Sequence, residues 1–152
     1  MNILFKLVTP ERTVFQEDVL SVTLPTEDGE ITILPEHIDL VSKLKPGVAE
    51  LRRPDGSLEE VAVSGGFIQV LNGSRITVLA DTAERGEELS LEVIEQAKAR
   101  AEAVMKEKIA AGDISYADSA AHLERELARY KAAMRYARRR GIRTSMHPST
   151  GA

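Results

Sequence analysis

The residue types most often used in catalysis and metal binding are present in this chain, but they are not arranged for either role. The three histidines, His37, His122 and His147, lie far apart, and no two have the spacing of metal ligands. The absence of cysteine excludes a thiolate nucleophile, a disulfide and a Cys-based zinc site. No phosphate-binding P-loop, dinucleotide-binding glycine motif or Gly-x-Ser-x-Gly elbow occurs. We therefore expect a noncatalytic protein that needs no cofactor.

The segment Ser64-Gly65-Gly66 could be a cradle for a phosphate group. A phosphate site of this kind uses the amide groups and the dipole at the start of a helix, whereas the residues after Gly66 have the alternating pattern of a strand. We interpret the segment as a tight turn or a bulge.

Basic residues concentrate near the end of the chain. Residues 119–152 contain eight Lys and Arg against two Asp and Glu, whereas residues 1–83 contain seven against thirteen. The centre of this basic cluster is Arg135, Arg138, Arg139, Arg140 and Arg143. It could bind phosphates or an acidic protein surface, or it could be a solvated helix end that complements the helix dipole. Nucleic acid is not an expected partner, because the cluster contains no Phe or Trp to stack on bases and the whole chain has a net charge of −4.

The period of the hydrophobic pattern changes near Asp81. Before it, apolar and polar residues alternate, as in residues 18–24 and 75–79, which is the pattern of strands with one buried face. Turn signals such as Asp55-Gly56 and Asn72-Gly73 separate the runs. The expected strands are residues 3–8, 13–16, 18–24, 30–34, 38–44, 47–53, 58–64, 66–72 and 75–80. Short strands at this spacing predict a sandwich or a barrel.

After Asp81 the pattern predicts two helices. We expect the first to begin at the N-cap Ser90 and to reach about Ala110, and the second to begin at Ser115 and to end at Gly141. In the second helix a narrow seam for pairing with another helix is predicted at Tyr116, Ala120, Leu123, Leu127, Tyr130, Met134 and Ala137. The predicted fold is α+β, an N-terminal antiparallel β-sandwich or barrel followed by a C-terminal antiparallel α-helical hairpin.

Three regions follow from this division: residues 1–85 as a strand domain, 86–141 as a hairpin, and 142–152 as a disordered tail. The hairpin is rich in alanine, which favours helix but buries little apolar area per residue. It could be permanently docked, or it could leave the strand domain when a partner offers a better surface. The chain has no basic leader and no apolar run of about 18 residues. We expect it in the cytosol, or at a membrane through a partner.

Several stretches of the chain resemble the epsilon subunit of bacterial F-type ATP synthases. The resemblance covers residues 3–140 and is strongest in four segments: 24–37 (LPTEDGEITILPEH), 44–47 (LKPG), 64–70 (SGGFIQV) and 78–85 (VLADTAER). It implies a strand domain at the foot of the central stalk of a proton-translocating enzyme. This domain would contact the gamma subunit and the ring of c subunits, on the cytoplasmic side of the plasma membrane. Glu30 and His37 match positions that face the c-ring in the family, although both could be ordinary exposed turn residues.

The resemblance also implies a role for the hairpin. In the family this element folds against the strand domain, or extends among the alpha and beta subunits and obstructs ATP hydrolysis. Arg135, Arg138, Arg139 and Arg140 would then pair with acidic side chains of a beta subunit. We expect buried seam residues such as Leu127, Tyr130 and Met134 to contribute most of the free energy, because an exposed ion pair contributes only about 0 to 1 kcal/mol.

Some family members bind ATP in the folded hairpin, and Glu84, Arg100, Arg125 and Arg129 match the binding positions. Arg125 and Arg129 are one helical turn apart, a spacing that suits a phosphate. The family motif Ile/Leu-Asp-x-x-Arg-Ala, however, reads Leu-Ser-Leu-Glu-Val-Ile in residues 89–94, so its Asp, Arg and Ala are all replaced. ATP is thus a candidate regulatory ligand. A free-standing ATP-sensing regulatory protein is the alternative function, and a small hydrolase would require a catalytic cluster that the sequence does not contain.

Overall fold

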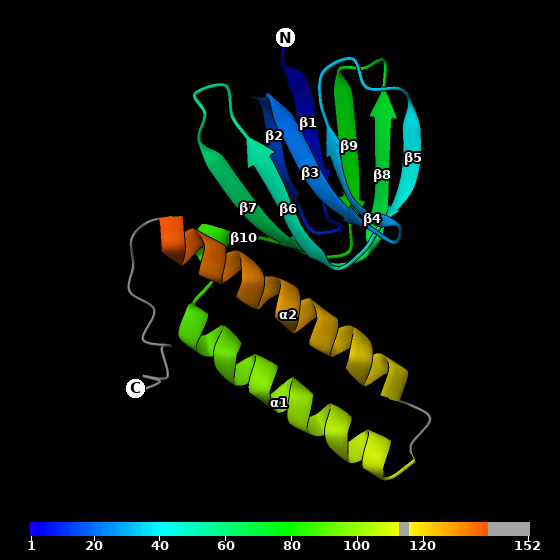
Figure 1. Cartoon of the computed structure of the whole chain (residues 1–152), viewed down its shortest axis with the longest axis vertical. Helices are drawn as coiled ribbons and strands as arrows, with labels where there is room; N and C mark the ends of the chain where they lie inside the picture. The colour runs from blue at the N-terminus through cyan, green and yellow to red at the C-terminus, as the bar shows by residue number, and fades with distance from the viewer. Residues whose placement is uncertain (113–115, 140–152) are drawn as a thin grey trace, which may run out of the picture.

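The strand region of the protein forms one sheet that curls into a nearly closed barrel (Figure 1). A computed structural model describes residues 1–112 and 116–139. Within them the strands are β1 (Ile3–Val8), β2 (Thr13–Val19), β3 (Ser21–Thr26), β4 (Gly29–Ile33), β5 (Leu40–Leu44), β6 (Gly47–Arg52), β7 (Leu58–Val63), β8 (Gly66–Leu71), β9 (Arg75–Ala80) and β10 (Ala83–Arg85). The predicted sandwich or barrel is therefore confirmed. The short β10 was not predicted, because three residues do not show an alternating pattern.

The order of strands in the sheet is β10-β7-β6-β3-β5-β8-β9-β1-β2, and β4 pairs with β3. Neighbouring strands are antiparallel, with the exception of β1 and β9 among the described pairs, which run parallel. The parallel pair forms because the first strand of the chain inserts between β2 and β9, the last strand of the β8–β9 hairpin. Asn72 and Gly73 both have positive φ in the β8–β9 turn, as expected for an Asn-Gly hairpin.

The core lies between the two faces of the curled sheet. Ile3, Phe5 and Leu7 of β1 alternate with exposed residues and are at most 1% exposed. Phe5 also packs on Phe15 of β2, with ring centroids 6.5 Å apart. Burial of each such side chain contributes about 1.5 to 3 kcal/mol, so this core stabilises the strand region without the helices.

Two helices follow the strands: α1 (Leu91–Ala110) and α2 (Tyr116–Arg139), after a short 3₁₀ helix, η1 (Gly86–Glu88). Ser90 is the N-cap residue of α1, as predicted, but its side chain makes no capping hydrogen bond. The predicted start of the second helix at Ser115 and its end at Gly141 lie outside the described residues, as does the predicted tail. Among the described helices, none is long and apolar enough to cross a membrane.

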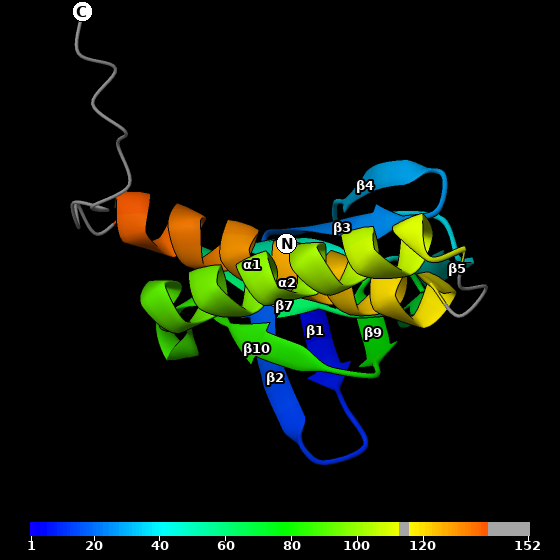
Figure 2. The ribbon, with the colours of Figure 1, turned by 90° about the horizontal axis from the view of Figure 1, so that it is seen from below.

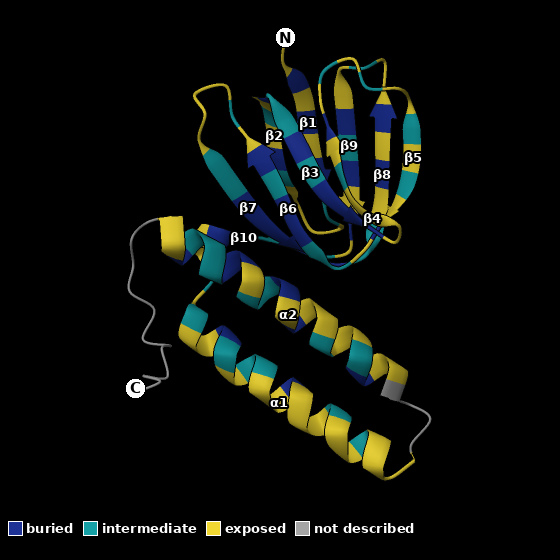
Figure 3. Ribbon diagram, viewed as in Figure 1, coloured by how far each residue is buried: buried dark blue, intermediate teal, exposed yellow. Residues whose placement is uncertain are grey.

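Helix α2 lies between the sheet and α1 (Figures 1 and 2). It packs on β6, β7 and η1, whereas α1 packs mainly on α2. The distribution of buried residues agrees with this arrangement, because α2 has more buried residues than α1 (Figure 3). The hairpin is therefore held to the strand region through α2.

The predicted seam of α2 is partly wrong. Leu127 is 40% exposed, whereas the charged Glu126 is only 4% exposed. The buried apolar residues of α2 are the small Ala128, Ala132, Ala133 and Ala137. The seam was misassigned because α2 contacts both α1 and the sheet, which buries a wider strip than a two-helix pair does. Alanine lets the helix approach the sheet closely but carries little hydrophobic signal.

Candidate functional site

The contact between α2 and the sheet has a small apolar centre. Ala132 of α2 packs on Val48 of β6 and Ala62 of β7, with the partly buried Leu89 beside them. These side chains are short, so the apolar area that α2 buries against the sheet is modest. Charged residues surround this apolar centre, and their ion pairs supply much of the remaining contact between the hairpin and the sheet.

On one side of this centre, two carboxylates from neighbouring strands share one arginine. Glu50 of β6 and Glu60 of β7 are directly opposite each other in the antiparallel register. Like charges in this position repel. Arg139, in the last turn of α2, forms ion pairs with both of them, and its Nη2 lies 3.5 Å from Glu50 Oε2. We call Glu50, Glu60 and Arg139 the carboxylate clamp.

Glu60 is the buried member of the carboxylate clamp, with 2% of its surface exposed. Its burial raises its pKa, and the nearby charge of Glu50 acts in the same direction. The charges of Arg139 and Arg135 oppose this shift without cancelling it. The docked helix therefore holds a carboxyl group where its ionised form is unfavourable unless a cation stays beside it.

A second charged cluster joins α2 to β10. Arg129 Nε lies 2.9 Å from Glu84 Oε1, and Arg129 Nη2 donates a hydrogen bond of 3.1 Å to Glu84 Oε2. Arg129 Nη1 donates to both carboxylate oxygens of the buried Glu126. Burial acts to lower the pKa of Arg129, but the bonds and charges of its two carboxylate partners outweigh it, so the pKa is raised. Arg129 is thus already neutralised by this chain.

The structure brings two of the four predicted nucleotide-binding residues together. Glu84 and Arg129 are in contact, as described above. Arg125 and Arg100 are exposed. Arg100 lines a cavity of about 290 Å³ between α1 and α2, together with Ala101 and Ser119. ATP binding at these residues stays an untested prediction, and the carboxylates already paired with Arg129 argue against it.

The predicted basic cluster divides between two environments. Arg139 belongs to the carboxylate clamp, and Arg135 is half-buried with its charge acting on Glu60. Arg138 is exposed. Arg140 lies outside the described residues.

Glu30 lies near the start of β4, and His37 lies beyond its end. Glu30 is exposed near the start of the strand, where it pairs in register with Pro25. His37 follows the end of β4 in the connection to β5, where its Nδ1 forms a hydrogen bond of 2.8 Å with the carbonyl oxygen of Ile38. The two residues therefore do not form one compact site within the chain.

An exposed apolar row crosses the outer face of the barrel. Phe67 of β8 and Leu79 of β9 are opposite each other in register and are 55% and 54% exposed. Val41 of β5, which is 72% exposed, is opposite Gln69 and therefore lies diagonal to Phe67, whose direct partner on β5 is Lys43. A cavity of about 350 Å³ beside Phe67 and Leu79 extends to Thr9 and Pro10. We call Val41, Phe67 and Leu79 the apolar row.

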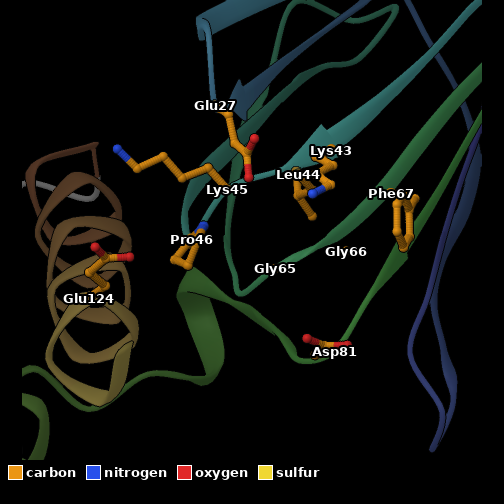
Figure 4. Close-up of a pocket in the computed structure, with 10 residues that line it drawn as sticks. All are labelled: Glu27, Lys43, Leu44, Lys45, Pro46, Gly65, Gly66, Phe67, Asp81 and Glu124. Carbon is orange, nitrogen blue, oxygen red and sulfur yellow. The ribbon is translucent and has the colours of Figure 1, made fainter. Parts of the chain in front are cut away.

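A wide cleft lies where the strand turns meet α2 (Figure 4). It has a volume of about 570 Å³ and includes Lys43, Lys45, Asp81 and Glu124. Cations and carboxylates are mixed in it, which does not suit a ligand of one charge. Ser64-Gly65 joins β7 to β8 at this end, as expected for a turn. The Ser64 hydroxyl oxygen accepts hydrogen bonds from Thr82 rather than facing a ligand.

Sequence reasoning missed both the carboxylate clamp and the apolar row. Glu50 and Glu60 have the spacing of ordinary strand residues, and only the strand register places them side by side. An alternation analysis could have found the apolar row, because Phe67 and Leu79 fall on the face that their strands expose. Two exposed large apolar residues in register are a signal for a binding surface.

Comparison with known proteins gives a consistent result. A family model described as the beta-sandwich domain of the ATP synthase delta/epsilon chain matches residues 2–86. The chain is 42% identical over 128 residues to the ATP synthase epsilon chain of Moorella thermoacetica, covering 84% of this chain and 93% of that one. It is 47% identical over 116 residues to the epsilon chain of Desulforamulus reducens, covering 76% and 86%.

A solved structure agrees with these sequence comparisons. A chain in the cryo-electron microscopy structure of the Euglena gracilis mitochondrial ATP synthase, containing OSCP, F1 and the c-ring, superimposes with a TM-score of 0.74. The two chains are 26% identical, and the match covers 88% of this chain and 81% of that one.

Proposed function

This chain belongs to the family of ATP synthase delta/epsilon chains, and on that premise we propose that it is a noncatalytic central-stalk subunit of a proton-translocating F-type ATP synthase. In this role it connects the gamma subunit to the c-ring, and its hairpin restrains ATP hydrolysis. The similarity to a chain in a complex of F1 and the c-ring supports the assignment to the stalk.

The apolar row is the observation that carries the proposal. A protein that works alone rarely exposes large apolar side chains opposite each other on a sheet. Phe67 and Leu79 do so beside an apolar cavity, on strands that the helices do not cover. We assign this surface to the gamma subunit, because it offers a rigid sheet face with aromatic and aliphatic anchors, as lasting protein interfaces do.

The polar edge of β4 supplies the second proposed contact. Glu30 is exposed to solvent, His37 is partly exposed, and both carry ionisable groups, which suits a contact with the polar loops of the c-ring. Attachment to the c-ring would hold the chain at the cytoplasmic side of the plasma membrane as a peripheral protein.

The hairpin supplies the proposed restraint. Because α2 contacts the sheet through short side chains and ion pairs, its docking is weak enough to be exchanged for a contact with the alpha and beta subunits. Arg135, Arg138, Arg139 and Arg140 are proposed to face acidic side chains of a beta subunit in the extended form.

Binding to a reconstituted complex of alpha, beta and gamma subunits tests the stalk assignment. We expect the full chain to bind stably in analytical ultracentrifugation, and the Phe67→Ser/Leu79→Ser variant to bind at least about tenfold more weakly. A matched control is Val93→Ser/Val104→Ser, which removes two exposed apolar residues of α1. Circular dichroism of each variant shows whether the fold is retained.

Two outcomes would argue against the proposal. Equal binding by the apolar-row variant and its control would remove the assignment of this surface. Failure of the full chain to bind, combined with tight ATP binding by the chain alone, would favour the alternative of a free-standing ATP-sensing regulatory protein.

A further inference from the structure

We propose that Arg139 is the counter-ion that makes docking of the hairpin possible, and that an acidic surface which captures Arg139 releases the hairpin. The proposal rests on the proposed function and adds a mechanism of regulation to it. It concerns the carboxylate clamp, in which one arginine of α2 meets two carboxylates of the sheet.

The first step is the geometry of the sheet without the helix. Glu50 and Glu60 are directly opposite each other on β6 and β7, where their charges repel. In water this repulsion is weak, because solvent and salt screen it. With the hairpin away from the sheet, both carboxylates can therefore remain charged.

The second step is what docking does to them. Helix α2 covers this part of the sheet and leaves Glu60 only 2% exposed. A charge that loses its water and has no partner destabilises the docked form strongly. Arg139 supplies the partner, since it forms ion pairs with Glu60 and Glu50 together.

The third step is an asymmetry between the partners. The side chain of Arg139 is 32% exposed and can turn toward water when its partner is lost. Glu60 cannot, because α2 covers it. Removal of the arginine therefore leaves a buried charge, whereas neutralisation of the glutamate leaves a cation that still has Glu50 and solvent.

The fourth step connects docking to partner binding. Both ion pairs of Arg139 in the carboxylate clamp use Nη2, and carboxylates on another protein compete with Glu50 and Glu60 for this one positive charge. An acidic surface that binds Arg139 thereby also removes the group that compensates Glu60. The hairpin responds to the partner because the partner acts more favourably on the undocked form.

Pulsed electron paramagnetic resonance on the isolated full chain tests the proposal. Because the chain has no cysteine, spin labels can be placed by Ser57→Cys, in the β6–β7 turn, and Glu107→Cys, on the exposed side of α1. A narrow distance distribution reports the docked form and a broad one reports the undocked form. A urea series gives the concentration at which the two are equal, which measures docking even where one form is scarce.

We expect Arg139→Gln to lower this midpoint by an amount that corresponds to about a tenfold or greater rise in the undocked-to-docked ratio. The exposed neighbour Arg138→Gln is the matched control and should change the ratio less than about twofold. Glu60→Gln should preserve docking, and Glu60→Gln/Arg139→Gln should recover most of the loss seen with Arg139→Gln alone. An unchanged midpoint in Arg139→Gln, or a double variant no better than that single variant, would overturn the proposal.

Poly-L-glutamate at low salt tests the capture step. It should lower the midpoint of the unsubstituted chain and of Arg138→Gln, and leave the Glu60→Gln/Arg139→Gln variant nearly unchanged. An equal shift in the double variant would contradict capture through Arg139. All of these measurements use the chain without other subunits, so they fail or succeed independently of its binding to the alpha, beta and gamma complex.

Discussion

A Cβ atom added to Gly86 would lie 3.0 Å from Cβ of Tyr136, and 3.4 Å from the carbonyl oxygens of Ala132 and Glu60. Gly86 begins η1, directly after the last strand, so the point where the chain leaves the sheet is also a point where α2 packs closely. Docking of the hairpin therefore depends on the absence of a side chain at this position.

Substitution of Gly86 should release the hairpin. We expect Gly86→Ala to raise the undocked-to-docked ratio several-fold and Gly86→Val to raise it further, because the added atoms crowd α2. Gly65→Ala is the control, since a Cβ there would meet its nearest neighbours at ordinary distances of 3.7 and 3.8 Å. The spin-label distances measure the ratio. If Gly86→Val is as fully docked as the control, the close packing at this point does not limit docking.

Loss of Arg129 should destabilise the whole hairpin. The substitution Arg129→Gln leaves the buried Glu126 without its cation, which should cost about 3 to 5 kcal/mol. Arg125→Gln removes an exposed arginine one turn away and should change the free energy of unfolding by less than about 0.5 kcal/mol. Urea unfolding followed by circular dichroism gives both values. Similar free energies of unfolding for the two variants would show that the ion pairs of Arg129 contribute little to stability.

Docking should weaken as the pH rises. The pKa of Glu60 is raised in the docked form by burial, so the docked form takes up a proton more readily than the undocked form does. Its contribution to docking is complete below the ordinary glutamate pKa of about 4.3 and is lost as the pH rises through the docked-form pKa. The other charged groups that act on Glu60 are Arg139 and Arg135 from α2, Glu50 from β6 and Glu59 from β7.

The urea midpoint of docking, measured with the spin labels, should therefore fall as the pH rises above the ordinary glutamate pKa. The same change should be much smaller in Glu60→Gln, which has no carboxyl group to titrate. An identical pH dependence in both proteins would assign the effect to other groups.

ATP should not stabilise this chain measurably. Two carboxylates already neutralise Arg129, so a phosphate would have to displace Glu84 or Glu126 and leave a charge unpaired. A site of micromolar affinity would raise the free energy of unfolding by about 4 kcal/mol at a thousandfold higher ATP concentration. Thermal unfolding with and without ATP measures this difference. A clear rise in the transition temperature that Arg125→Gln abolishes would establish the nucleotide site instead.

Local sequence patterns predicted most of the fold. Alternation located the strands, and Asn72-Gly73 located a turn, because these features depend only on residues that are close in the chain. The helix from Leu91 to Ala110 was likewise predicted from its cap and its period. The pairing of β1 with β9 could not be predicted in this way, because the two strands are far apart in sequence.

The sites were less predictable for the same reason. Glu60 resembles its neighbour Glu59 in sequence, yet Glu59 faces arginines at the sheet surface whereas Glu60 is covered by a helix about seventy residues later. Leu127 was expected to be buried from its heptad position, but α2 turns alanines toward the sheet instead. Burial at a helix–sheet contact depends on the angle of approach, which a single-helix pattern does not encode.

Site-specific photocrosslinking tests whether the apolar row binds the gamma subunit in the stalk. A photoreactive amino acid replaces Phe67 in the full chain, and the assembled ATP synthase is irradiated and its crosslinked products are identified by mass spectrometry. We expect the gamma subunit to be the main crosslinked partner, and a probe at Val93 on α1 not to give the same product. If position 67 crosslinks to other subunits and gamma is absent from the products, the apolar row does not bind the gamma subunit.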